Sequence, residues 1–231
     1  MDFPNRYKRN FESISEAEQA TLASAHVVVV GCGGLGGAVS EMLARAGVGH
    51  IRVIDADVFE ESNLNRQLMA TEVTLGKSKA QAAKECIAQV NSEVEVDACE
   101  VFLDENNAAQ LLEGMDCVVD CLDSVESRLW MAHAALHLGI PVVHGAIAGW
   151  FGQVCTVVPG DPSFATIYGA IEEGGEGVQK QLGNLVQTAW GTASFQVAEV
   201  LKVLLGRDGM LRNRLLMIDF LSGSAESIDL A

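Results

Sequence analysis

A glycine-rich turn between an apolar run and a helical segment is the feature that most limits how this chain can fold. The run HVVVVG at residues 26–31 continues into GCGGLGG, where Gly31, Gly33 and Gly36 fit the spacing G-x-G-x-x-G. A strand, such a turn and a helix together bring backbone N–H groups to a helix N-terminus, where they can bind a phosphate group. The alternative is that these glycines only allow close packing of the helix on the strand.

An acidic residue ends the next predicted strand, HIRVID, at residues 50–55. Asp55 lies 24 positions after Gly31. At that point in such a fold, a carboxylate accepts hydrogen bonds from the hydroxyls of a nucleotide ribose. The strand, glycines, helix and acid occur in the expected order, which favours a nucleotide site over packing glycines. They do not distinguish NAD, FAD and ATP.

Strand-like and helix-like segments alternate along most of the chain. Further strands are predicted at 94–101, 117–121 and 141–146, with helices at 16–24, 34–46, 79–90, 105–113 and 125–139. This βαβ series predicts an α/β fold with a Rossmann-like, doubly wound and mostly parallel sheet.

The last third of the sequence departs from that alternation. The segment GQVCTVV, residues 152–158, follows a strand after only a short turn, so antiparallel strands are expected toward the C-terminus. A long apolar helix at 188–206 and a strand at 215–220 complete the prediction. Because no repeat or linker interrupts the chain, we expect a single domain over 1–231, with an N-terminal arm at 1–25 and a mobile crossover segment at 160–187.

The charge balance limits the partners that the chain can bind. Lys and Arg number 15 against 31 Asp and Glu, which gives a formal net charge of −16 and disfavours nucleic acid. No apolar run is long enough to span a membrane or to form the core of a signal peptide, so a cytoplasmic protein is expected. The six cysteines lie in apolar segments, and most of them are interpreted as small buried residues.

A polar cluster after Asp55 favours a nucleotide with several phosphates. Arg66 can form charge-assisted hydrogen bonds with phosphoryl oxygens, and Asn63 can orient a phosphate or the ribose. Lys79, at the start of the next helix, adds a second positive charge. The alternative is a solvated loop followed by an ordinary amphipathic helix.

These residues resemble the E1-like adenylating enzymes, the ThiF/MoeB/HesA group that activates small ubiquitin-like sulfur carriers. The matching blocks are RYKRN, GCGGLGG, DADVFEESNLNRQ, LGKSKA and CLDSVESR, in that order. The resemblance covers about the first 150 residues strongly and the remainder more loosely.

The resemblance implies a role for each matching position. Gly31, Gly33, Gly34 and Gly36 would form the nucleotide loop, and Asp55 would hold the ribose. The triphosphate would be surrounded by Ser62, Asn63, Arg66, Gln67 and Lys79. Asp123, followed by Ser124 at the end of a predicted strand, would bind Mg²⁺, with a helix N-cap as the alternative. Arg9 would reach the γ-phosphate of the neighbouring subunit in a homodimer.

The implied activity is ATP-dependent adenylation, by Arg9, Arg66, Lys79 and Asp123, of the C-terminal carboxylate of a carrier that ends in Gly-Gly. The cysteine pairs that hold zinc in many relatives are missing, and a metal site at His133, His137 and His144 is improbable, so no zinc is expected. The crossover loop also lacks the family's transfer cysteine. Cys155 is expected in the core.

Three other functions are compatible with parts of the sequence. A tRNA threonylcarbamoyladenosine dehydratase also lacks the zinc cysteines, and its D-S-V segment resembles Asp123 to Val125, but the net charge of −16 disfavours a tRNA substrate. A non-catalytic nucleotide-binding scaffold would not need Arg9, Arg66, Lys79 and Asp123 together. An NAD-dependent dehydrogenase does not explain SNLNRQ or the N-terminal arginines.

Overall fold

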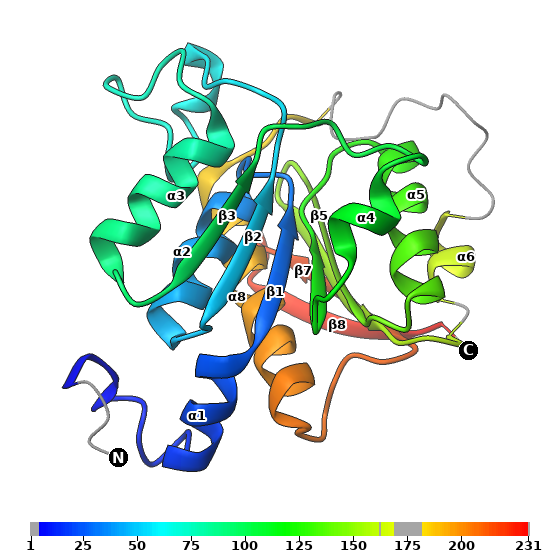
Figure 1. The fold of residues 1–231 in the computed structure, drawn as a ribbon. Coiled ribbons are helices and arrows are strands. Elements are labelled where there is room, and N and C mark those ends of the chain that lie inside the picture. The colour runs from blue at the N-terminus through cyan, green and yellow to red at the C-terminus, as the bar shows by residue number, and fades with distance from the viewer. Residues whose placement is uncertain (1–4, 162, 169–181, 231) are drawn as a thin grey trace.

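An eight-stranded sheet forms the centre of the molecule in the computed structural model, which describes residues 5–161, 163–168 and 182–230. The strands follow the spatial order β3-β2-β1-β4-β5-β6-β7-β8 (Figure 1). Their bounds are β1 His26–Val30, β2 His50–Ile54, β3 Glu95–Cys99, β4 Cys117–Asp120, β5 Val142–Ala148, β6 Phe151–Val157, β7 Arg214–Asp219 and β8 Ser224–Asp229.

The first five strands are parallel and form the doubly wound part of the sheet. Strand β1 pairs with β2 on one side and with β4 on the other, so the direction of winding reverses between β1 and β4. In β1, residues Val27 to Val30 are all buried, as expected for a strand covered on both faces. A reversal of this kind opens a crevice at the carboxyl ends of the strands, which is where such folds bind ligands.

Helices cover both faces of the sheet (Figure 1). On one face, α2, α3 and α8 pack over a core that includes Val29, Leu43 and Val200. On the other, α4, α5 and α6 pack over a core that includes Val28, Leu112 and Met131. The helix bounds are α1 Glu16–Ser24, α2 Gly36–Ala46, α3 Lys79–Val90, α4 Ala108–Leu112, α5 Val125–His137, α6 Ser163–Tyr168 and α8 Val186–Leu205, with short 3-10 turns η1 at Asn5–Tyr7 and η2 at Glu61–Asn63.

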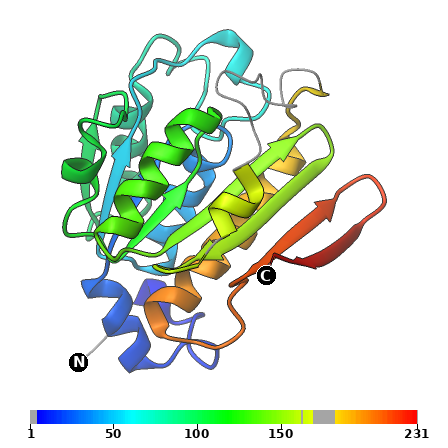
Figure 2. The ribbon, with the colours of Figure 1, turned by 90° about the vertical axis from the view of Figure 1, so that its right-hand side faces the viewer.

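The antiparallel strands expected toward the C-terminus are confirmed. Strand β6 returns along β5 after a tight turn at Gly149, whose φ of 56° is in the left-handed region that favours glycine. Strands β7 and β8 continue the sheet and form a hairpin that projects from the body (Figure 2). All six residues of β8 are exposed, so its sequence SAESID carries no hydrophobic pattern from which a strand could be predicted.

One predicted helix differs from its expected bounds, and part of the predicted crossover segment lies outside the described residues. The helix predicted at 105–113 is shorter, because the side chains of Asp104 and Asn107 bond to nearby backbone groups before α4 begins. Helix α6 and the stretch 182–187 are the main described parts of the predicted crossover segment, and residues 169–181 of that segment lie outside the described residues. Within the described ranges, no helix has the length and apolar character needed to span a membrane.

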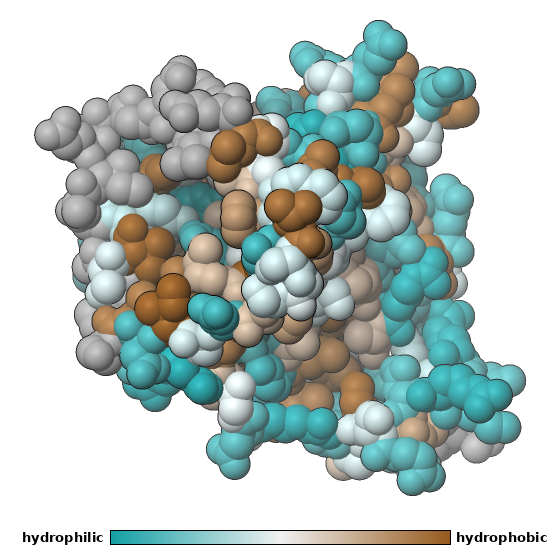
Figure 3. Space-filling model, turned by 180° about the vertical axis from the view of Figure 1, so that it is seen from behind, coloured by the Kyte–Doolittle hydropathy of each residue, from teal (hydrophilic) through white to brown (hydrophobic). Residues whose placement is uncertain are grey.

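Large apolar side chains remain exposed beyond the core. Figure 3 shows the molecule from the side opposite to Figure 1, with hydrophobic side chains exposed at several places. Trp190 and Phe195 on α8 and Trp150 and Phe151 at the start of β6 are each between 41% and 45% exposed. Two of the three tryptophans are therefore on the surface. Cys155, which was expected in the core, is buried in β6.

Candidate functional site

The glycine loop joins β1 to α2 at the carboxyl edge of the sheet. Gly31 has a φ of 92°, and a Cβ there would lie 2.7 Å from the carbonyl oxygen of Cys121. A Cβ on Gly36 would lie 1.7 Å from the carbonyl oxygen of Gly31. Close packing alone therefore requires glycine at these two positions.

Gly33 and Gly34 are different. A Cβ at Gly33 would lie 3.6 Å from the Gln67 side chain, and one at Gly34 would lie 3.4 Å from the Ala189 side chain, both ordinary contacts. Packing therefore does not require glycine at either position. Both line a pocket at this edge of the sheet, and the missing side chains leave the loop backbone open to a ligand.

Asp55 follows β2 and is tied to the glycine loop. Its carboxylate accepts hydrogen bonds from the backbone N–H of Cys32, at 2.7 Å, and from that of Asp57, at 2.8 Å. Burial raises the pKa of the Asp55 carboxyl, while these two N–H groups and Lys79 act in the opposite direction. The carboxylate is therefore fixed in orientation at the mouth of the pocket.

Two cationic side chains line the pocket and are held by neighbours. The Lys79 ammonium, with a side chain only 9% exposed, lies 2.9 Å from the Asp57 carboxylate. Arg66 donates to the Ser62 carbonyl at 3.0 Å and to the Asn65 side chain at 2.8 Å. Holding both cations in place before a ligand arrives lowers the entropy cost of binding an anion.

Gln67 and Asn63 belong to the same loop, but only Gln67 lines the pocket. Gln67 is 7% exposed and lines the pocket, and its buried Oε1 atom has no hydrogen-bond partner among the described residues. The side-chain oxygen of Asn63 accepts from the Glu60 backbone N–H at 3.0 Å, so Asn63 shapes the loop. Neither Asn63 nor Ser62 lines the pocket.

The segment after β4 supplies an exposed carboxylate. Asp123 is exposed and lines the pocket. The helix N-cap that was the alternative role for Asp123 belongs to Ser124, whose hydroxyl accepts from the Ser127 backbone N–H at 3.4 Å. Asp123 therefore has no capping role, and Ser124 does not line the pocket.

The pocket brings together most of the predicted nucleotide-binding residues. Those that line it are Gly31, Gly33, Gly34, Asp55, Arg66, Gln67, Lys79 and Asp123. It also has an apolar wall at residues 101–103 and contacts from Asn184, Leu122 and Arg128, which sequence reasoning did not assign to it. The residues fit a nucleoside triphosphate. The donors Arg66 and Lys79 and the open backbone of the glycine loop face the same space as Asp123, whose carboxylate is suited to Mg²⁺.

Arg9 lies at the other end of the sheet. Its arm is anchored where α2 and α3 end, through the Tyr7 hydroxyl, which accepts from the Asn91 side chain at 2.7 Å. Figure 1 places this arm next to α1, at the end of the molecule where β1 begins, whereas the pocket is lined by Val30 and Ile54 at the opposite, carboxyl ends of β1 and β2. Arg9 is exposed and does not line the pocket of its own chain.

The three histidines considered for a metal site do not converge. His133 and His137 stack on the exposed side of α5 with ring centroids 5.6 Å apart. His144 is buried in β5, and its Nδ1 lies 2.7 Å from the Asp120 carboxylate. Among the described residues, no three His, Cys, Asp or Glu side chains are grouped to hold a metal ion.

Comparison with known proteins identifies the family. The model of the ThiF family matches residues 7–231. This chain belongs to the ThiF family. It is 34% identical over 227 residues to the SAMP-activating enzyme E1 of Haloferax volcanii, covering 97% of this chain and 84% of that protein. The expected relation to E1-like adenylating enzymes is confirmed.

Other ThiF-family relatives are adenylyltransferases. The sulfur carrier protein ThiS adenylyltransferase of Bacillus subtilis is 36% identical, with 88% of this chain matching 62% of that protein. The molybdopterin-synthase adenylyltransferase of Haemophilus influenzae is 31% identical, with 97% of this chain matching 94% of that protein. The chain is thus of the ThiF/MoeB adenylyltransferase type, and some relatives extend well beyond the matched region.

Solved structures support the fold. The crystal structure of E. coli MccB with ATP superposes with a TM-score of 0.84 at 24% identity, covering 99% of this chain and 72% of that chain. E. coli tRNA N6-threonylcarbamoyladenosine dehydratase, TcdA, gives a TM-score of 0.73 at 24% identity, covering 87% of this chain and 94% of that chain. The Rossmann-like α/β class is therefore confirmed, whereas the roles of individual ThiF-family site residues stay predictions.

Proposed function

We propose that this protein uses ATP to adenylate the C-terminal carboxylate of a small ubiquitin-like sulfur-carrier protein. The observation that carries the proposal is the pocket, in which the open backbone of the glycine loop faces Arg66, Gln67 and Lys79. The names of the relatives, which include a ThiS adenylyltransferase and a SAMP-activating enzyme, support a carrier of this class.

In this proposal the nucleotide lies across the carboxyl edge of the sheet. Its phosphates lie over Gly33 and Gly34, beside the N-terminus of α2, where backbone N–H groups and the helix dipole favour negative charge. Asp55 accepts from the ribose hydroxyls, and the apolar wall at 101–103 covers the base. Arg66 and Lys79 neutralise the phosphates.

The reaction needs charge neutralisation more than proton transfer. A carrier carboxylate oxygen forms a bond to the α-phosphorus, the bond between that phosphorus and the bridging oxygen breaks, and pyrophosphate leaves. The nucleophile is already an anion, so no general base is required. Arg66 and Lys79 stabilise the charge that develops on the leaving group. When bound by Asp123, Mg²⁺ would supply further neutralisation at the phosphates.

Pyrophosphate exchange tests the proposal and selects the carrier. Purified protein is incubated with ATP, Mg²⁺ and labelled pyrophosphate, together with a ThiS-type, a MoaD-type or a SAMP-type carrier. Label should enter ATP with at least one carrier and only while its Gly-Gly end is intact. A dehydratase would instead hydrolyse ATP in response to modified tRNA, and a non-catalytic scaffold would do neither; either result would reject the proposal.

We further propose that the enzyme is a homodimer in which Arg9 completes the partner's site. The anchoring of the arm at the far end of the sheet keeps Arg9 away from its own pocket. In a two-fold dimer, each arm can reach the other subunit's pocket, and a guanidinium beside the γ-phosphate would add a further cation to Arg66 and Lys79.

Mixing two inactive variants tests this arrangement. Arg9→Ala and Asp123→Ala proteins should each be inactive alone, whereas subunit exchange should restore about a quarter of wild-type activity, since half of the dimers are mixed and one site in each is intact. Pyrophosphate exchange measures the recovery, and an Arg45→Ala protein mixed with wild type is the control. Absence of recovery despite demonstrated subunit exchange would place Arg9 outside the partner's site.

A further inference from the structure

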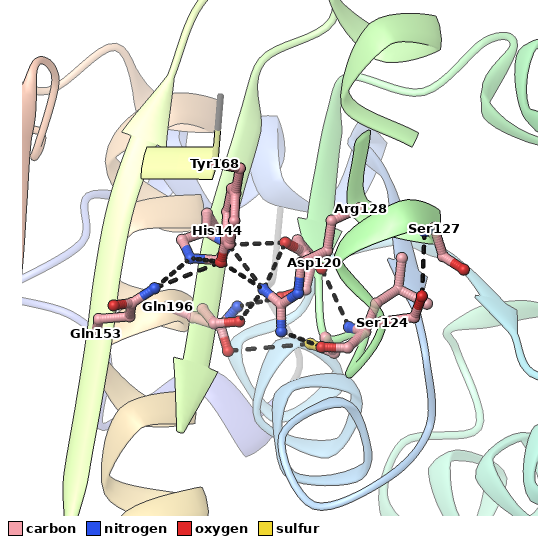
Figure 4. A network of polar contacts seen from close by, with 11 residues as sticks. Asp120, Ser124, Ser127, Arg128, His144, Gln153, Tyr168 and Gln196 are labelled. Carbon is pink, nitrogen blue, oxygen red and sulfur yellow. Dashed lines mark hydrogen bonds and ion pairs between the residues drawn. The ribbon is translucent and has the colours of Figure 1, made fainter. Parts of the chain in front are cut away.

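A buried network of polar side chains reaches the pocket through Arg128 and has no part in the mechanism above. It joins Asp120 at the end of β4, Arg128 on α5, His144 on β5 and Tyr168 on α6 (Figure 4). Asp120 and His144 are each 0% exposed and Arg128 is 2% exposed. Burying a charged pair and an imidazole is costly, so their arrangement requires a reason beyond packing.

The hydrogen bonds allow one arrangement of protons. Arg128 lies 3.0 Å from the Asp120 carboxylate, and it keeps the pKa of that carboxyl below its usual value in spite of burial. Since a carboxylate only accepts, His144 must carry its proton on Nδ1, which lies 2.7 Å from Asp120. Burial lowers the pKa of His144, so its Nε2 is free to accept from the Tyr168 hydroxyl at 3.1 Å.

One end of the network holds the backbone next to Asp123. The Leu122 N–H donates to the Asp120 carboxylate at 3.1 Å, and the Leu122 carbonyl accepts from the Arg128 guanidinium. The residue before Asp123 is therefore held on both its N–H and its carbonyl side by a buried ion pair. This fixes the backbone from which Asp123 reaches the pocket.

The other end of the network is helix α6. The ring of Phe164 meets His144 edge-on with centroids 5.6 Å apart and stacks with Tyr168 at 6.0 Å. The Tyr168 hydroxyl lies within 3.4 Å of the Gln153 side chain as well as 3.1 Å from His144. Both Phe164 and Tyr168 of α6 thus pack against the His144 imidazole, which bonds to Asp120.

We propose that Arg128 and Tyr168 are positioning residues that couple the packing of α6 against His144 to the placement of Asp123 in the pocket. The inference rests on the proposed function, because Asp123 is taken to bind the magnesium of the nucleotide. Coupling between two sites is reciprocal, so Mg·ATP in the pocket must also stabilise α6 against local opening.

The test compares Tyr168→Phe and Arg128→Lys with Thr156→Val. The last variant also removes a buried hydroxyl, one that bonds to Glu199 at 2.5 Å and does not line the pocket. Calorimetry measures ATP binding with Mg²⁺ and with EDTA. Tyr168→Phe should weaken binding about fivefold with Mg²⁺ and leave binding in EDTA unchanged. Arg128→Lys changes a residue that also lines the pocket, so it should weaken binding under both conditions but more strongly with Mg²⁺, whereas Thr156→Val should change neither.

Hydrogen–deuterium exchange supplies the reciprocal measurement. In the wild-type protein, Mg·ATP should slow amide exchange in residues 163–168 at least threefold, and Tyr168→Phe should remove this protection. Equal weakening with Mg²⁺ and with EDTA, or no protection of α6 in the wild type, would overturn the coupling while leaving the proposed function standing. If the wild-type protein does not bind ATP, the proposed function fails and the coupling fails with it.

Discussion

Replacing Asp123 by alanine is expected to reduce ATP–pyrophosphate exchange at least 100-fold without unfolding the protein. Asp123 is exposed at the pocket and does not cap α5, so its removal breaks no side-chain hydrogen bond to the residues that the structure describes. What is lost is a carboxylate that places magnesium against the phosphates. The loss of one such electrostatic element costs about 3 kcal/mol of transition-state stabilisation.

Glu126→Ala is the matched control for this variant. Glu126 is an exposed acidic residue three positions further along, in the first turn of α5, and it does not line the pocket. Its replacement should leave pyrophosphate exchange within about twofold of wild type. That result would show that the loss of activity in Asp123→Ala does not come from removing a negative charge near the pocket. Near-normal exchange by a folded Asp123→Ala protein would reject the proposed role.

Replacing Arg128 by methionine is expected to have the largest effect on stability. The change keeps most of the side-chain volume but leaves the buried Asp120 carboxylate without its cation. Breaking a buried ion pair in this way costs about 3–5 kcal/mol of the free energy of unfolding. Urea unfolding at neutral pH measures the cost.

The pH dependence of that cost provides a second check. In the wild type, the lowered pKa of Asp120 contributes stability above the ordinary carboxyl value, and that contribution is lost as the pH falls through the folded-state pKa. Without Arg128 the carboxyl takes up a proton more readily, so the difference between the two proteins should shrink toward acidic pH. Arg45→Met, which breaks an exposed pair with Glu41, should cost no more than about 1 kcal/mol. Equal costs for the two variants would contradict the account.

Much of the fold could be predicted because its central strands carry strong local signals. Val27 to Val30 form a β-branched run followed by glycines, and the turn at Gly149 is too short for a crossover helix. Such patterns depend only on neighbouring residues. Strand β8 has no such pattern, since all six of its residues are exposed and it is placed by pairing with β7 at the edge of the sheet.

The buried network was missed for a different reason. Asp120 and His144 lie 24 positions apart and become register partners only when β4 pairs with β5. The local sequence offers one signal, the aspartate that ends the buried apolar run CVVD. A carboxylate buried at that position requires a partner inside the protein, but the sequence does not show which residue it is. The pocket residues, by contrast, lie in motifs next to the glycine loop and the following strands. Asn184 follows a segment with no such motif.

Intact-mass measurement of the carrier tests the central claim most directly. A carrier with a Gly-Gly end is incubated with the enzyme, ATP and Mg²⁺, with pyrophosphatase present to remove the leaving group, and is weighed by mass spectrometry. The account predicts a carrier that gains one AMP group, no gain when the terminal glycines are deleted, and none with the Asp123→Ala enzyme. Consumption of ATP with an unmodified carrier, or AMP attached at a site other than the C-terminus, would contradict it.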